Sequence, residues 1–356
     1  MTLWRAVLLP LLLAGCGAKP MAAQPTLDGQ PPIVIAHRGA SGERPEHTLA
    51  AYRLAIDLGA DFIEPDLVLT QDGVLVARHE NEISETTDVA DHPEFASRKA
   101  TKTIDGVEVS GWFTEDFTLA ELKTLRAKER LPKLRSTEYD GQYAVPTFAE
   151  ILDLLAEVNK DRAKPVGVYP ETKHPSYFAA IGLPHEAALL AILDKYGYKG
   201  RRAPVFIQSF EVANLKAIRA KSDLPLIQLI DGEGGPADDP KASYAAMASP
   251  AGLRAIATYA DGIGPNKAMV IPRGALGTLG DPTGLVRDAH AAGLKVHPWT
   301  FRRENYFLPL GDKGGVNPAG HGDLAAEINA YLATGIDGLF SDNPREAVVV
   351  TRAAQR

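Results

Sequence analysis

Short apolar segments alternate with longer amphipathic segments from Ile33 to the end of the chain. Apolar runs of about four to eight residues, bounded by polar, Gly or Pro positions, predict buried strands, and apolar positions at helical spacing predict helices. The predicted strands are 33–37, 62–69, 74–79, 166–171, 204–209, 224–230, 261–265, 294–299 and 336–341. The predicted helices are 46–58, 147–158, 184–196, 211–220, 249–259, 282–292 and 322–333. Strands separated by helices favour an α/β fold with a parallel sheet.

The number of strand–helix units favours a TIM barrel. About eight units in ~310 residues fit a (β/α)8 barrel better than a doubly wound sheet, and no G-x-G-x-x-G motif follows the first strand. Nine strands are predicted, one more than a barrel of this kind needs. The sequence "TQDGV" at 70–74 explains the ninth, because Asp72-Gly73 is a tight-turn signal. We therefore expect 62–69 and 74–79 to form a hairpin that brings His79 opposite Glu64.

Residues 82–146 interrupt this alternation with mixed charges, scattered Gly and Pro, and short periodic pieces such as "TLAELKTL". A structureless loop of that length is unusual in a compact domain. We interpret it as an insertion, after the second strand and its hairpin, that caps the mouth of the barrel. The expected barrel domain covers residues 32–356.

The N-terminus has the features of an export signal. Arg5 precedes the apolar run "AVLLPLLLAG", which is too short for a transmembrane helix of ~20 residues, and Cys16 follows directly. The ending "LLAGC" resembles the lipobox of bacterial lipoproteins, in which the cysteine is lipidated. We expect a signal peptide at 1–15, lipidation at Cys16 and a small, polar, Pro-containing tether at 16–31. The alternative is a plain signal peptide with an incidental cysteine.

Composition narrows the function classes. The chain has 356 residues, is 45% hydrophobic and carries a formal net charge of −7. That length suffices for one large α/β domain, and the acidic balance argues against binding to nucleic acid. A single cysteine excludes an intramolecular disulfide.

Polar residues gather at the predicted strand ends, where a barrel keeps its functional groups. Glu64 and Asp66 are two residues apart, so strand periodicity points both side chains the same way. Glu171 and Lys173 repeat this spacing. Further polar or aromatic residues at strand ends are His37, Arg38, Gln208, Trp299 and Asp342.

Three carboxylates that converge on one barrel mouth repel one another unless a positive charge joins them. Oxygen ligands without cysteine favour a hard divalent cation, so Glu64, Asp66 and Glu171 predict a site for Ca²⁺ or Mg²⁺. The alternative is that these acids form salt bridges with Arg38 and Lys173.

Two histidines at neighbouring strand ends, His37 and His79, suit general acid–base catalysis near neutral pH. Arg38 and Lys173 beside a cation form an electropositive pocket suited to one phosphate. The residues therefore predict metal-assisted cleavage of a phosphodiester. His47 fits either a structural or a functional role, and a structural role is expected for His92, His174, His185, His290 and His321.

Successive motifs along the chain resemble those of the glycerophosphodiester phosphodiesterases. They are "HRGASGERPEHTLAAY", "GADFIEPDLVLTQDGVLVARHE", "PETKHP", "QSF", "HPWTF" and "GLFSDNP", and they cover about residues 33–345 in the family's order. The resemblance is strongest to the secreted bacterial branch, which cleaves deacylated phospholipids to glycerol 3-phosphate and an alcohol. His47 stands where asparagine is commoner in the wider family, and Glu80 stands where aspartate is usual.

The resemblance implies a TIM barrel with an insertion, and it implies a role for each candidate residue. His37 and His79 would be the acid–base pair, and Glu64, Asp66 and Glu171 would hold the metal, with Ca²⁺ expected before Mg²⁺. Phosphate binding falls to Arg38 and Lys173, and Gln208 and Trp299 would complete the pocket. The substrates would be small glycerophosphodiesters such as glycerophosphocholine and glycerophosphoethanolamine.

Location follows from the N-terminus. We expect the chain on the periplasmic side of the cell envelope, touching the membrane only through its lipid anchor. Gly17 rather than aspartate after Cys16 points to the outer membrane if the host is Gram-negative.

Two other functions fit part of this pattern. A lipid phosphodiesterase of the phospholipase C or sphingomyelinase D type would need an exposed apolar rim, but the insertion offers only "GWF" at 111–113. A non-catalytic solute-binding lipoprotein would explain the lipobox and the anion pocket, but it would not require two histidines flanking a metal.

Overall fold

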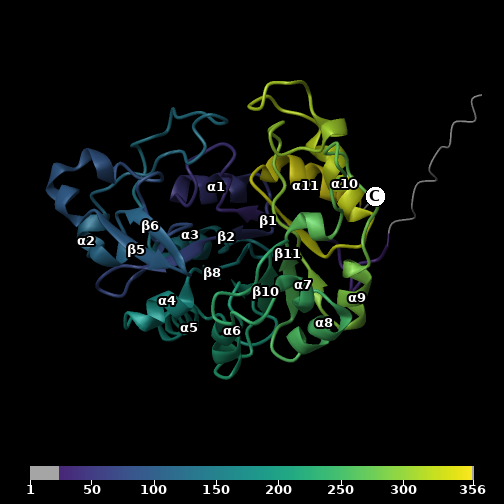
Figure 1. Ribbon diagram of the computed structural model, residues 1–356, viewed down its shortest axis with the longest axis horizontal. Coiled ribbons are helices and arrows are strands. Elements are labelled where there is room, and N and C mark those ends of the chain that lie inside the picture. Colours follow the sequence, from purple (N-terminus) through teal and green to yellow (C-terminus); the bar gives the residue numbers. More distant parts are fainter. Residues whose placement is uncertain (1–23, 355–356) are drawn as a thin grey trace, which may run out of the picture.

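Parallel strands form a closed barrel surrounded by helices in the computed structural model, which describes residues 24–354 (Figure 1). In order round the ring, the strands are β1 (Ile33–His37), β2 (Phe62–Glu64), β7 (Gly167–Val168), β9 (Ile207–Ser209), β10 (Leu226–Ile230), β11 (Gly262–Pro265), β12 (Lys295–Val296) and β13 (Gly338–Ser341). Strand β1 pairs in parallel with both β2 and β13. The backbone N–H of Asp337 donates to the carbonyl oxygen of Val296 (2.9 Å) and joins β12 to β13. The predicted TIM barrel is confirmed.

The predicted strand 62–69 is broken at Pro65, which lacks the N–H needed to continue a ladder. Its second half, β3 (Asp66–Leu69), pairs antiparallel with β4 (Leu75–Ala77) and parallel with β8 (Glu171–Thr172). The predicted hairpin therefore forms.

The expected register of that hairpin is wrong by one residue. Leu67 pairs with Ala77, and the N–H of Arg78 donates to the carbonyl oxygen of Asp66 (3.0 Å). The turn is centred on Asp72 because Gly73, at φ 75°, closes it over 70–74. His79 consequently lies beyond β4 rather than opposite Glu64.

Helices cover the outside of the barrel. Those near predicted positions are α1 (Leu49–Asp57), α3 (Phe148–Val158), α5 (His185–Lys195), α6 (Val212–Arg219), α8 (Pro250–Ile256), α9 (Leu285–Ala291) and α10 (Leu324–Leu332). Three more were not predicted: α4 (Pro175–Ala180), α7 (Tyr244–Met247) and α11 (Pro344–Ala353). Helix α11 contains "VVV", a run with strand propensity, which hid the helical pattern. Short 3-10 turns are η1 (Val89–Asp91), η2 (Pro93–Arg98), η3 (Thr114–Asp116), η4 (Lys267–Met269) and η5 (Leu310–Asp312).

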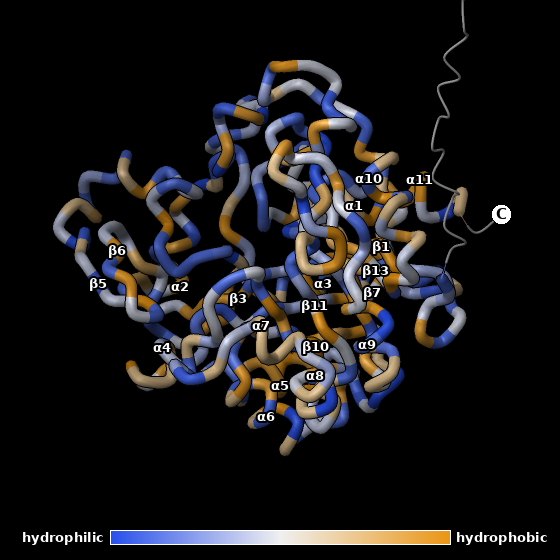
Figure 2. Tube along the Cα trace, turned by 45° about the vertical axis from the view of Figure 1, so that its right-hand side comes forward, coloured by the Kyte–Doolittle hydropathy of each residue, from blue (hydrophilic) through white to orange (hydrophobic). Residues whose placement is uncertain are grey.

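Hydrophobic residues gather along the strands and the helices packed on them (Figure 2), and most of the buried ones belong to one large cluster. Inside the barrel, Ile35, Phe62, Tyr169, Ile227 and Phe340 form one buried cluster. His297 joins this cluster, and its Nδ1 pairs with the hydroxyl of Tyr169 (2.9 Å), which gives a buried polar group the partner it needs. This packed interior supports the polar strand ends above it.

The insertion has secondary structure of its own, and its hairpin and helix lie to one side of the barrel (Figure 1). It contains the hairpin β5 (Ala100–Ile104) and β6 (Val107–Gly111), followed by α2 (Leu119–Leu122). Its later part reaches the barrel, where Arg135 pairs with Asp342 (2.6 Å) just after β13. The insertion therefore contacts the carboxyl ends of the strands.

The start of the described chain lies against the opposite end of the barrel. The N–H of Leu27 donates to the carboxylate of Asp337 (2.7 Å), which precedes β13, and Lys295 at the start of β12 pairs with Asp28 (2.6 Å). The predicted signal peptide, Cys16 and the first part of the predicted tether lie outside the described residues. Within residues 24–354, no helix combines the length and the apolar character needed to cross a bilayer.

Candidate active site

Three buried carboxylates meet at the carboxyl ends of the strands. Glu64 ends β2, and Asp66 and Glu171 are paired in register at the starts of β3 and β8. One oxygen from each lies within 4.8 Å of the others, and the three residues are 1%, 1% and 6% exposed. Among the described residues, this is the only group of acids, histidines or cysteines with such a geometry. The predicted metal ligands are therefore brought together.

Each carboxylate is fixed by partners on neighbouring elements. Glu64 accepts hydrogen bonds from the backbone N–H of Arg38 (2.8 Å) and from the side-chain amide of Gln208 (3.0 Å). His47 Nε2 lies 2.9 Å from Asp66, and Lys173 lies 3.1 Å from Glu171. The acids are thus held close together despite their mutual repulsion.

Burial and neighbouring charges shift the pKa values of the three acids in different directions. Burial opposes ionisation of Asp66, but His47 and Arg38 outweigh it and hold the pKa of Asp66 well below its usual range. Burial and the negative charge of Asp66 raise the pKa of Glu64. Burial also raises the pKa of Glu171 to about 8, against the opposing effect of Lys173. Without a cation the cluster therefore retains protons near neutral pH.

The donor set suits a hard divalent cation. It consists of carboxylate oxygens, and the buried Oε1 of Gln208 has no hydrogen-bond partner among the described residues. Oxygen ligands of this kind match Ca²⁺ or Mg²⁺. The alternative salt bridges are present, between Arg38 and Asp66 and between Lys173 and Glu171. They do not bring the pKa of Glu64 back to its usual range.

Arg38 is one of two buried cations of the site; the other is Lys173. Its guanidinium lies 3.0 Å from Glu46 and 3.3 Å from Asp66, and these carboxylates raise its pKa although burial opposes the charge. Its backbone has φ 58°, a conformation that residues other than glycine rarely adopt. Arg38 and Lys173 together place two positive charges beside the carboxylate cluster.

His37 ends β1 in register with Glu64, and its Nδ1 lies 2.6 Å from Asp342. Asp342 is itself fixed by Arg135 (2.6 Å) and Arg302 (2.7 Å). Burial and the positive charge of Arg38 lower the pKa of His37 to about 4, although Asp342 partly compensates. The ring is therefore neutral at neutral pH in the free protein.

His79 follows β4, and its Nδ1 lies 2.9 Å from Glu80. Burial, Arg38 and Lys173 lower the pKa of His79 to about 3. The two predicted catalytic histidines thus share one arrangement, in which Nδ1 faces a carboxylate. A neutral ring that donates from Nδ1 leaves Nε2 as an acceptor.

Gln208 and Trp299 occupy different parts of the site. Gln208 contacts Glu64 directly. Trp299 donates from its indole N–H to Gly264 (2.8 Å) and packs edge-on against Phe210 (5.9 Å between ring centroids), and the amine of Lys173 lies 5.9 Å from the Phe210 ring. Beside Phe210 and Lys173 lies a cavity of about 300 Å³, which Glu171 and Tyr244 also line.

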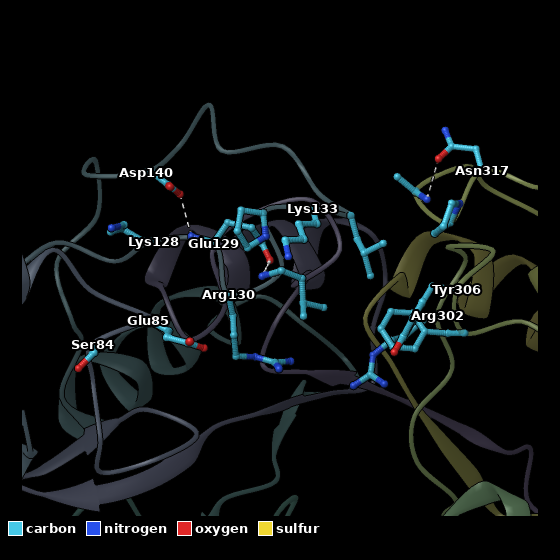
Figure 3. Close-up of a pocket in the computed structure, with 16 residues that line it drawn as sticks. Ser84, Glu85, Lys128, Glu129, Arg130, Lys133, Asp140, Arg302, Tyr306 and Asn317 are labelled. Atoms are coloured by element: carbon cyan, nitrogen blue, oxygen red, sulfur yellow. Dashed lines mark hydrogen bonds between the residues drawn. The ribbon is translucent and has the colours of Figure 1, made fainter. Parts of the chain in front are cut away.

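A larger cleft of about 1040 Å³ lies between insertion residues 128–134 and residues 302–319 (Figure 3). Arg130 and Arg302 enter it from opposite sides. Arg130 pairs with Glu46 (2.9 Å), the partner of Arg38, and Arg302 pairs with Asp342, the partner of His37. Glu46 and Asp342 therefore connect the cleft to the site, because each contacts one arginine of the cleft and one residue of the site.

Sequence reasoning missed the side chains that hold the predicted residues. They are Glu46, Glu80, Arg135, Arg302 and His174, and His47 belongs with them because it contacts Asp66. Asp342 was noted only as a strand-end residue. Most of these residues stand beside motif residues in the sequence, and that position could have indicated a role at the site. Arg135 lies in the insertion, and nothing in the sequence near it indicates such a role.

Comparison with known proteins points to one family. Residues 37–346 match the sequence profile of the glycerophosphoryl diester phosphodiesterase family. A glycerophosphodiester phosphodiesterase of Arabidopsis thaliana is 40% identical over 94% of this chain and 92% of its own length. One from Haemophilus influenzae is 30% identical over 98% and 97%. A phosphodiesterase from Oleispira antarctica, solved with the product sn-glycerol-3-phosphate, has the same fold, with a TM-score of 0.61 at 22% identity over 92% of this chain and 99% of that one.

The raised pKa of Glu171 predicts that its contribution to the stability of the metal-free protein falls as the pH rises. Glu171 titrates near 4.5 when unfolded but at about 8 when folded, so the folded state binds more protons between these values. This contribution is fully present below pH 4.5 and is lost as the pH rises through about 8. The lowered pKa values of buried histidines such as His37 and His79 act in the opposite direction, but only at acidic pH. In thermal unfolding with chelator, we therefore expect the midpoint to fall between about pH 7 and about pH 9, and excess Ca²⁺ should remove the decline.

Glu171→Gln provides the control, since an amide of the same shape does not titrate. The difference in stability between this variant and the wild type should grow with pH when chelator is present. A difference that does not change with pH would contradict the shifted titration.

Proposed function

The chain belongs to the glycerophosphoryl diester phosphodiesterase family, and we propose that its buried carboxylates, two basic side chains and two histidines carry out a metal-assisted hydrolysis. The protein hydrolyses glycerophosphodiesters to sn-glycerol 3-phosphate and an alcohol. The observation that supports this mechanism best is the cluster of Glu64, Asp66 and Glu171 beside Arg38 and Lys173.

Binding of the phosphate falls to the two cations. Arg38 presents a planar fork of N–H donors that matches two phosphate oxygens, whereas Lys173 supplies a point charge. Glu64, Asp66 and Glu171 would hold Ca²⁺, or Mg²⁺ in its place, and the ion would withdraw negative charge from the phosphoryl oxygens. The cleft of about 1040 Å³ offers space for the alcohol portion of the substrate.

Proton transfer falls to His37 and His79. Either water or the 2-hydroxyl of the substrate's glycerol attacks the phosphorus; in the second case a cyclic phosphate forms first, and water then opens it to glycerol 3-phosphate. One imidazole takes the proton of the attacking hydroxyl. The other protonates the departing alkoxide. Both rings are neutral in the free protein because burial lowers the pKa of each, and the positive charge of Arg38 lowers it further. A bound phosphodiester anion offsets that positive charge and raises the pKa of the ring that acts as the acid.

The cellular location is part of the proposal. The lipobox "LLAGC" at 12–16, with the polar tether after it, supports a lipoprotein of the secreted bacterial branch on the periplasmic side of the envelope. Gly17 supports the outer membrane in a Gram-negative host.

A coupled assay for glycerol 3-phosphate tests the reaction and its metal requirement. We expect turnover of glycerophosphocholine and glycerophosphoethanolamine, loss of turnover with chelator and recovery with Ca²⁺. Glu171→Gln should need more Ca²⁺, because it removes one charged ligand. Activity that chelator does not change would contradict the metal requirement. Turnover of lysophosphatidylcholine alone would favour a lipid phosphodiesterase, and saturable binding without product would favour a solute-binding protein.

Single and double histidine variants test the acid–base pair. His37→Ala and His79→Ala should each lower kcat by ~10²–10⁴-fold, and the double variant should lose much less than the product of the two effects. A glycerophosphodiester of p-nitrophenol needs little protonation of its leaving group, so it should restore the rate of only the variant that lacks the acid. Equal behaviour of both variants with this substrate would refute the division of roles.

Fractionation of cells tests the anchor. The wild-type protein should be found with the membranes and labelled by fatty acid, and Cys16→Ala should be soluble and unlabelled. A single acyl chain binds membranes only marginally, so stable retention requires more than one chain. Wild-type protein found entirely in the soluble fraction would refute the anchor and leave the catalytic mechanism unaffected.

A further inference from the structure

A chain of close contacts between histidines and carboxylates links the insertion to His79. In the turn of the β5–β6 hairpin, Asp105 lies 2.6 Å from Nδ1 of His174. The other ring nitrogen of His174, Nε2, lies 2.7 Å from Glu80. Through its second oxygen, Glu80 lies 2.9 Å from Nδ1 of His79. Residues far apart in sequence thus hold the carboxylate that contacts a proposed catalytic histidine.

The backbone supports a role for these contacts beyond packing. Among the described residues, only four other than glycine have a positive φ: Arg38, His47, Asp105 and His174. Such conformations persist where the surrounding structure enforces them, and they concentrate at functional sites. Arg38 and His47 both contact Asp66 in the carboxylate cluster. Asp105 owes its positive φ to the two-residue turn that it forms with Gly106 between β5 and β6. His174 lies in no such turn, and it contacts Asp105.

Helix capping does not explain the imidazole of His174. The residue is the N-cap of α4, at φ 48°, but its side chain makes no capping hydrogen bond. Both ring nitrogens instead face carboxylates, so the ring donates from both and carries a positive charge. Burial opposes this charge, but the hydrogen bonds to Asp105 and Glu80 outweigh it and raise the pKa of His174 to about 9.

His37 is held by a similar arrangement of a carboxylate and cations. Its partner Asp342 is fixed by two cations, Arg135 and Arg302, as Glu80 is fixed by His174. Each proposed catalytic ring therefore faces a carboxylate that a buried cation immobilises. A carboxylate fixed in this way determines both the orientation of the ring and which nitrogen carries the proton.

We propose that His174 is a positioning residue for the hydrolysis: it fixes Glu80 and thereby holds His79 with Nε2 toward the substrate, and Asp105 of the insertion anchors it. This proposal rests on the role assigned to His79 under the proposed function. It makes the β5–β6 turn of the insertion a part of the catalytic apparatus.

Steady-state kinetics with glycerophosphocholine and saturating Ca²⁺ test this role. His174→Ala should lower kcat by ~10–100-fold and leave KM unchanged, as expected when an outer partner of a catalytic group is removed. His174→Gln should recover part of the loss, because its amide can still donate to Glu80 but cannot reach both carboxylates with N–H donors. Asp105→Asn should have a smaller effect in the same direction.

His92→Ala is the matched control. Like Asp105, His92 lies in the insertion, and like His174 it pairs with a carboxylate, Glu94 (3.1 Å), so its loss removes a similar contact away from His79. We expect wild-type kcat for this variant. Circular dichroism and thermal unfolding of every variant, at the assay temperature, separate lost folding from lost positioning; if His174→Ala does not fold, His174→Gln carries the comparison.

The decisive measurement is a double-mutant comparison with glycerophosphocholine at high enzyme concentration, which keeps slow variants measurable. A residue that acts through His79 has no further effect once His79 is gone, so His79→Ala/His174→Ala should be no slower than His79→Ala. A wild-type kcat for folded His174→Ala, or a full additional loss in the His79→Ala background, would overturn the proposal. Full activity of His79→Ala would instead overturn the assignment of His79 itself.

Discussion

Mutual repulsion among three buried carboxylates is the constraint on which the rest of the site depends. Glu64, Asp66 and Glu171 are removed from water and lie within 4.8 Å of one another, an arrangement that is unfavourable without compensating positive charge. The barrel makes it possible, because adjacent parallel strands fix the backbone of each acid while packed aromatic side chains support them from below. Arg38 and Lys173 compensate part of the charge, His47 forms a hydrogen bond with Asp66, and the remaining negative charge favours a divalent cation.

The same principle extends outward from the carboxylates. The cations near the cluster are held by further acids, and those acids are held by further cations. Glu46 lies between Arg38 and Arg130, and Asp342 lies between His37 and the pair Arg135 and Arg302. Buried ion pairs contribute little net stability, since desolvation offsets their attraction. Their value here is geometric: they fix the orientation of the groups that we propose contact the phosphate.

The sequence predicted the barrel and the residues at the strand ends, because both follow from local patterns. Apolar runs alternated with helices, and Glu64, Asp66, Glu171 and Lys173 had the two-residue spacing of strands. The register of the hairpin was wrong by one residue because the turn at Gly73 depends on a backbone conformation that composition does not specify. Partners such as Arg135 and Asp342 could not be paired, since 207 residues separate them and only the closed barrel brings them together. His174 was expected to be structural, because its contacts depend on how the insertion folds.

The first described residues meet the barrel at the end where the strands begin. Leu27 and Asp28 are bound there, by Asp337 and Lys295, whereas the carboxylates and histidines lie at the end where the strands finish. A lipid on Cys16 would hold the protein by its base, with the catalytic mouth turned toward the aqueous compartment. An enzyme oriented in this way meets dissolved diesters directly, and phospholipids still embedded in the same membrane lie on its far side.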